Sequence, residues 1–123
     1  SKADDRAGAK VALIRAVELD PSYAFACHRL FDLHLEDKEP AEARTVLGHL
    51  QRHDPGDWTA THEVEWFAAK GDTQAACQSL ARLLDITEHE WDAVDRAVEA
   101  MVKAKMAEPL AAQLDRSITS LLA

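Results

Sequence analysis

The dipeptide Asp-Pro occurs at Asp20-Pro21 and again at Asp54-Pro55, 34 residues further along the chain. Each copy follows a run of apolar residues with helical periodicity and begins a polar turn. Proline disfavours a helical conformation in the residue before it and is well accepted in the first turn of a helix. Each copy therefore marks the end of one helix and the approach to the next. A fixed period of this length is typical of stacked helical repeats rather than of one closed domain.

Small and apolar residues recur with the same period. A step of 34 residues aligns five columns of them, and so many matches in one register favour a true repeat. The third copy is degenerate, because Asp115 falls where Leu47 and Ala81 stand in the earlier copies; terminal repeats are often atypical, since one of their faces meets water. The columns are Ala26, Ala60 and Val94; Leu30, Val64 and Val98; Ala43, Cys77 and Ala111; Val46, Leu80 and Leu114; and Leu50, Leu84 and Ile118.

The composition favours helices and a modestly acidic surface. Four glycines and four prolines occur in 123 residues, and no segment has the alternating β-branched pattern of a strand. The formal net charge of −8 argues against nucleic acid and anionic membranes as partners, because both attract basic surfaces. No stretch approaches the roughly 18 apolar residues of a membrane span. Cys27 and Cys77 lack metal-ligand spacing, so we expect a reducing, cytoplasmic setting.

Apolar stripes, turns and breakers predict an all-α chain of about seven helices joined by short links. Asp72 is expected to cap the helix that follows the Gly71-Asp72 turn. Trp58 and Trp91 begin their helices and are expected to cover hairpin ends by packing. The predicted helices cover about 4–19, a segment after the 20–22 turn through 35, 40–53, 57–70, 73–84, 88–106, and a segment from the 107–109 turn to about 122.

The run from Arg15 to Pro21, RAVELDP, followed by a helix pair and a second Asp-Pro, resembles a tetratricopeptide repeat array. The family's packing positions are matched by Ala9, Leu13 and Ala16, by Ala43, Leu47 and Leu50, and by Cys77, Ala81 and Leu84. Phe31 and Glu65 stand where the family has a small residue, so a tetratricopeptide-like variant is an equal alternative.

The resemblance implies antiparallel helix hairpins stacked as a right-handed solenoid. Because the first helix resembles the second half of a hairpin, we expect this chain to be part of a longer array. A single tetratricopeptide-like domain is expected over 1–123. It would comprise an incomplete repeat (1–20), two repeats (22–54 and 56–86) and a degenerate terminal repeat (88–123).

In tetratricopeptide arrays the first helix of each pair lines a concave groove in which peptides bind, so the resemblance implies such a groove here. Trp66 is the strongest candidate, because tryptophan offers a large apolar area and one N–H donor; packing against a neighbouring repeat is the alternative. The implied groove residues are Phe25, His28, Asp32, Leu35 and Glu36 in one repeat, Thr59, His62, Trp66 and Lys70 in the next, and Arg96, with Ala100 and Lys103, in the third.

The charges along this implied groove differ between its ends. Asp32 and Glu36 favour a basic or neutral peptide group at one end. Lys70, Arg96 and Lys103 make the other end positive. We therefore expect a ligand whose charges are split along its length.

Histidines allow several interpretations. His28 and His62 could bind an acidic group, respond to pH, or hold a metal with a neighbouring carboxylate, but we expect solvated surface side chains. His49 and His53 have the i, i+4 spacing of a metal site, yet they lie on a helix that should face outward without a third ligand nearby. His34 occupies a packing position and is expected to be a hydrogen-bonded core residue.

No enzyme signature is visible. Thr61-His62-Glu63 begins like a zinc-protease helix, but Trp66 stands where the second His is required. We predict no catalytic residue, no cofactor and no metal site. The predicted function is a protein-interaction module that binds a peptide or protein partner, without nucleic acid or membrane.

Several alternatives stay open. The chain could instead be a structural or self-associating segment of a longer solenoid, forming a homo-oligomer, or a substrate-positioning appendage of an enzyme encoded elsewhere in the full-length chain. A pentatricopeptide-type RNA reader has a similar period, but the acidic charge argues against it. Helical-pair solenoids with other periods are a further alternative.

Overall fold

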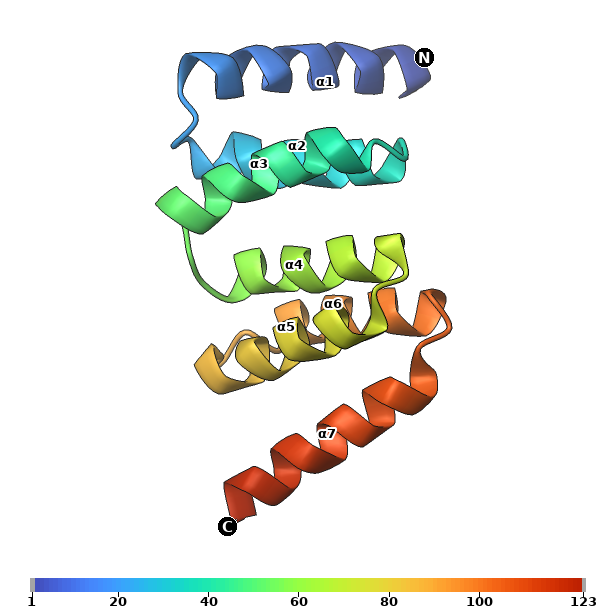
Figure 1. The fold of residues 1–123 in the computed structure, drawn as a ribbon. Helices are drawn as coiled ribbons and strands as arrows, with labels where there is room; N and C mark the ends of the chain where they lie inside the picture. The colour runs from blue at the N-terminus through green and yellow to red at the C-terminus, as the bar shows by residue number, and fades with distance from the viewer. Residues whose placement is uncertain (1, 123) are drawn as a thin grey trace. The chain divides into compact units, whose positions relative to one another are not determined.

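The computed structural model describes residues 2–122, which form seven α-helices and no strand (Figure 1). The all-α prediction is therefore confirmed. Two compact units are distinguished, Ser1–Pro55 with the first three helices and Gly56–Ala123 with the other four. The helices are α1 (Lys2–Leu19), α2 (Ala24–Glu36), α3 (Pro40–His53), α4 (Asp57–Lys70), α5 (Thr73–Ile86), α6 (Trp91–Lys103) and α7 (Ala107–Leu122).

The predicted ends of the first five helices lie within about two residues of the observed ones, whereas α6 is shorter than predicted. Glu90 has a non-helical ψ of 62°, so α6 begins only at Trp91. At its other end Lys105 takes a φ of 63° in the left-handed region, which terminates the helix. The turn predicted around Pro109 is instead the first turn of α7, where the missing N–H of proline breaks no helical hydrogen bond.

In the first unit, α2 and α3 form a hairpin closed by a short turn. The N–H of Asp37 donates to the carbonyl of Leu33 (3.0 Å), and Lys38 takes a φ of 60° to reverse the chain. α1 also packs on α2, but Val17 is its one buried residue. The core between α2 and α3 consists of side chains at most 2% exposed: Ala26, Cys27, Leu30, Phe31, Ala43, Leu47 and Leu50.

In the second unit, α4 and α5 form a hairpin through the Gly71-Asp72 turn. Gly71 has a φ of 76°, which glycine adopts without the steric cost of a side chain. The Oδ1 atom of Asp72 accepts a hydrogen bond from the N–H of Ala75 at 3.1 Å, so the predicted cap is confirmed. Both helices of this hairpin have further neighbours: α4 packs on α6, while α5 packs on α7 and on α6.

Small residues lie where α4 meets its neighbours. Ala60, Ala76, Ala93 and Ala97 have no exposed surface, and the hydroxyl of Thr61 donates to the carbonyl of Ala93 at 2.8 Å. A side chain of α4 therefore reaches the backbone of α6, which requires the two helices to approach closely. Among the described residues, no helix is long and apolar enough to cross a membrane.

Replacing Asp72 with Ala is expected to lower the free energy of unfolding by about 1 kcal/mol, because an N–H in the first turn of α5 loses its acceptor. Chemical denaturation measures this change. Asp72→Asn should retain most of the stability, and Asp115→Ala, an exposed carboxylate within α7, serves as the control. Equal losses for Asp72→Ala and Asp115→Ala would contradict a stabilising cap.

Candidate partner-binding surface

The predicted binding residues of the first unit all lie on α2. Phe25 is 64% exposed, and its ring centroid is 6.2 Å from that of Tyr23. Asp32 and Leu35 are half-buried, and Glu36 is exposed. These positions leave Phe25 as the largest accessible apolar group of the predicted set in this unit.

His28 is not the solvated side chain that the sequence suggested. It is half-buried, and its Nε2 atom lies 2.8 Å from Oδ2 of Asp54. Asp54 follows the last residue of α3, so this contact joins the hairpin's two helices at one end. The second Asp-Pro dipeptide thus supplies a side-chain contact as well as a helix end.

Glu36 belongs to an ion-pair network at the α2–α3 turn. Arg6 contacts Glu36 (3.0 Å) and Asp37 (2.9 Å), while Lys10 contacts Asp37 (2.6 Å) and Glu39 (2.5 Å). Hydrogen bonds from Arg6 and Lys10 lower the pKa of Asp37 from its usual value to about 2. The charge that we expected Glu36 to offer a ligand is thus shared with α1, an arrangement that the local sequence does not reveal.

His34 lies beside this network. It is 7% exposed, and its Nδ1 atom is 2.9 Å from Oε1 of Glu39. The prediction of a hydrogen-bonded core histidine is confirmed. The hydrogen bonds from Lys10 and then from His34 lower the pKa of Glu39.

In the second unit, Thr59 and His62 are buried, with exposed fractions of 2% and 1%. The expectation that His62 is solvated is therefore wrong. Its Nδ1 atom is 2.8 Å from Oε1 of Glu65, and the other oxygen of Glu65 accepts a hydrogen bond from Arg96 on α6 at 2.9 Å. Burial raises the pKa of Glu65, but the hydrogen bonds and charges of His62 and Arg96 outweigh it and lower that pKa. Glu65 was not among the predicted residues, although it connects two of them.

Trp66 and Lys70 occupy one face of α4. Trp66 is half-buried, with its ring edge-on to that of Phe67 at a centroid distance of 5.3 Å. The ammonium of Lys70, which is exposed, lies 5.8 Å from the centroid of the Trp66 ring. At that separation the cation is attracted by the face of the ring. The pair therefore presents an aromatic surface with a positive charge above it.

The remaining tryptophans differ from each other. Trp58 is half-buried, and the guanidinium of Arg96 lies 5.6 Å from the centroid of its ring. Trp91 is 61% exposed, so the expectation that it packs over a hairpin end is wrong. α6 begins at Trp91, and the first residue of a helix has no preceding turn against which to pack.

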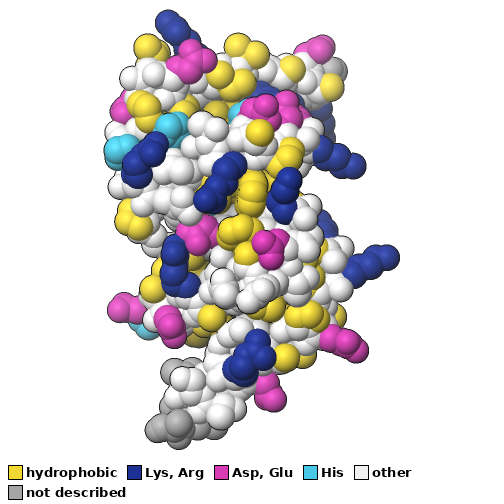
Figure 2. All heavy atoms as spheres, in the orientation of Figure 1, with side chains coloured by type: hydrophobic (Ala, Val, Ile, Leu, Met, Phe, Trp, Pro, Cys, Tyr) yellow, Lys and Arg dark blue, Asp and Glu magenta, His cyan; other side chains and the backbone are white. Residues whose placement is uncertain are grey.

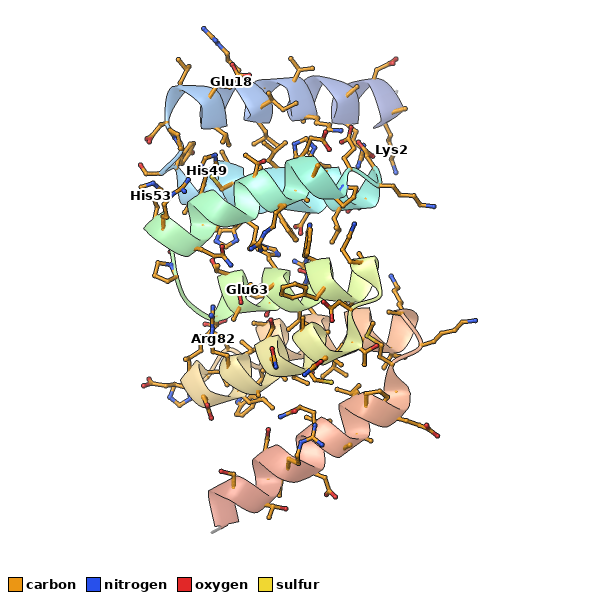
Figure 3. All side chains as sticks on the ribbon, viewed as in Figure 1. Lys2, Glu18, His49, His53, Glu63 and Arg82 are labelled. Carbon is orange, nitrogen blue, oxygen red and sulfur yellow. The ribbon has the colours of Figure 1, made fainter. Side chains whose placement is uncertain are left out.

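Glu63 is a buried carboxylate that the sequence analysis did not single out as functional. It is 5% exposed and pairs with Arg82, so that a side chain of α4 meets one of α5 (Figure 3). A buried charge needs such a partner, because leaving it unpaired is strongly destabilising. We assign this pair to the packing of the hairpin.

A third group of polar side chains surrounds the end of α3. His49 is half-buried and His53 is exposed, and Nη2 of Arg52 lies 2.9 Å from Nδ1 of His49. Burial, together with the charges of Arg52 and His53, lowers the pKa of His49. Asp20, in the α1–α2 link, accepts hydrogen bonds from Ser22 that lower its pKa, and the nearby imidazole of His53 lowers it further.

Comparisons with family models, curated proteins and solved structures give no match to this chain. Within each unit, the visible face carries acidic and basic side chains interspersed with apolar ones rather than a patch of one sign (Figure 2). Because no patch of one charge sign marks a binding surface on this face, a binding role must lie with individual contacts. The clearest of these is the pair formed by Trp66 and the exposed Lys70.

Acid should weaken the contact between α1 and the α2–α3 turn, because protonation of Asp37 removes the charge that binds Arg6 and Lys10. The folded-state pKa of Asp37, about 2, lies below its ordinary value of 3.8. Its stabilising contribution is therefore present above pH 3.8 and is lost as the pH falls towards 2. Urea denaturation between pH 5 and 2 measures this effect.

The variant Asp37→Asn should be less stable than the wild type at pH 5, and most of this difference should be gone at pH 2, where Asp37 of the folded wild type is about half protonated. Asp5→Asn, which removes an exposed carboxylate of α1, is the matched control and should change little at either pH. A constant difference between Asp37→Asn and the wild type over this range would contradict the predicted linkage.

Proposed function

We propose that this chain is a tetratricopeptide-like interaction module that binds a peptide or protein partner on the first helices of its hairpins. Packing within the second unit supports the proposal. There the first helix of one hairpin, α4, contacts the first helix of the next, α6, and the second helices α5 and α7 also contact each other. Equivalent helices stack in this way in helical repeats, and we propose that the hairpins continue as a right-handed solenoid.

The observation that carries this proposal is the pair formed by Trp66 and the exposed Lys70. Trp66 is half-buried, and a tryptophan held in this manner can bury further area against a partner without much loss of side-chain freedom. Among the described residues Lys70 forms no ion pair, so its charge is available to an acidic group. Lys103 is exposed in the last turn of α6, the helix packed beside α4, and adds a second cation.

These features favour a particular ligand chemistry. An apolar side chain would contact the ring of Trp66, and a carboxylate beside it would pair with Lys70 or Lys103. Arg96 contributes less, because Glu65 already binds its guanidinium. Thr59 and His62 are buried and therefore support α4 rather than contact the ligand. In the first unit Phe25 is the accessible apolar group of the equivalent helix, α2.

Self-association is the second candidate function. The last two helices expose several large apolar residues, which are often buried when copies of a chain meet. Size measurement in solution separates the two functions, because a stable dimer favours the second. The exposed residues are Trp91 (61%), Val102 (53%) and Ile118 (55%). A reducing, cytoplasmic setting remains a proposal; Cys27 and Cys77 are both buried and unpaired in disulfides.

Trp66→Ala and Lys70→Glu should each weaken binding of an acidic, apolar-containing peptide selected from a displayed library against the full chain. A hot-spot tryptophan contributes about 2 kcal/mol or more, so Trp66→Ala should raise Kd roughly 30-fold. Calorimetric titration measures Kd, and circular dichroism verifies folding.

Matched controls are Ile118→Ala, an exposed apolar residue of the second helix α7, and Lys105→Glu, an exposed lysine in the α6–α7 link. Both should leave Kd unchanged. Lys70 is exposed, so Lys70→Glu remains informative if Trp66→Ala fails to fold. Selected peptides that bind folded Lys70→Glu as tightly as the wild type would overturn the proposed surface.

A further inference from the structure

The last turns of α3 carry two imidazoles at i, i+4 spacing, His49 and His53. α3 is helical through His53, so this spacing places the two Cβ atoms about 5–6 Å apart on one face. Figure 3 draws both side chains on the same side of the helix end. Metal–nitrogen bonds of about 2.0–2.1 Å lie within the reach of two rings so placed, and helical histidine pairs at this spacing bind zinc in other proteins.

The two rings differ in how they are held. His49 is half-buried, which restricts its ring, whereas His53 is exposed at the end of α3 and has room to turn towards it. A chelate of this kind loses less conformational freedom on binding, because one ligand is already restrained. Open access at His53 also leaves coordination positions for water.

The α1–α2 link carries a carboxylate, Asp20, whose pKa the imidazole of His53 helps to lower. The Oδ1 atom of Asp20 accepts hydrogen bonds from the backbone N–H of Ser22 (3.1 Å) and from its hydroxyl (2.6 Å). These bonds orient the carboxylate in the α1–α2 link, and among the described residues Oδ2 accepts none. Its negative charge favours a cation bound at the two histidines without supplying a ligand.

We propose that His49 and His53 form a surface chelate for a divalent transition-metal ion of the Zn²⁺, Cu²⁺ or Ni²⁺ class, with water in the remaining coordination positions. Imidazole nitrogens suit these ions, whereas Mg²⁺ and Ca²⁺ prefer sites made of oxygen ligands. The net charge of −8 favours accumulation of cations near the protein. The site is independent of the proposed peptide surface, since none of its residues lies on α4 or α6.

Arg52 is a competitor for this ion. Its guanidinium donates to Nδ1 of His49 at 2.9 Å, and a ring that accepts there carries its own proton on Nε2. A metal ion bound at either nitrogen therefore requires Arg52 to withdraw or the ring to change tautomer. Removing Arg52 should consequently strengthen metal binding, a result that a purely structural role for the two histidines does not predict.

The test is calorimetric titration of the full chain with Zn²⁺, Cu²⁺ or Ni²⁺. His49→Gln and His53→Gln should each weaken binding by at least about tenfold, since even partners outside the coordination sphere contribute roughly 10–100-fold. Arg52→Ala should tighten binding severalfold. His89→Gln, which removes an exposed histidine of the α5–α6 link, is the matched control and should have no effect.

A second readout is thermal unfolding, because an ion that binds the folded chain raises its Tm. Zn²⁺ should raise the Tm of the wild type and of His89→Gln, but not that of His53→Gln. The proposal would be overturned by absent binding, by affinity that survives both His49→Gln and His53→Gln, or by Mg²⁺ binding as tightly as Zn²⁺.

Discussion

Close approach between helices at alanine residues is the constraint on which the second unit depends. Ala60 and Ala97 have no exposed surface, and the hydroxyl of Thr61 bonds directly to the backbone carbonyl of Ala93. A larger side chain at these crossings would force α4 and α6 apart, at a typical cost of about 1–3 kcal/mol. Because α4 also packs on α5, its position determines where Trp66 is presented.

Much of the fold could be predicted because its signals are local. The N-cap of Asp72 requires only a side-chain oxygen at the start of a helix, and the 34-residue columns identified Ala26, Ala43 and Ala60, all of which are buried. The C-terminal end of α6 was predicted wrongly, because it depends on an unusual backbone conformation of one residue. Lys105 adopts a positive φ that the sequence gives no reason to expect from a lysine.

The candidate site was less predictable, because its contacts join residues that are distant in sequence. Glu65 and Arg96 are 31 positions apart, and only folding brings α4 and α6 together. The burial of His62 was missed as well. The 34-residue period placed His62 on the first helix of a hairpin, but it carried no information about its burial or its contact with Glu65. Trp66 and Lys70 are neighbours within one helix, so their pairing could have been found from the i, i+4 spacing alone.

Amide hydrogen exchange of the full chain, followed by NMR, tests most directly whether packing centres on α4. Local opening is rarest where a helix has buried contacts on several sides. The slowest exchange is therefore expected in the middle of α4, around Ala60 and Val64, because every residue from Thr59 to Val64 is buried there. α1, with Val17 as its one buried residue, should exchange much faster. Protection of α1 equal to that of α4 would contradict this account.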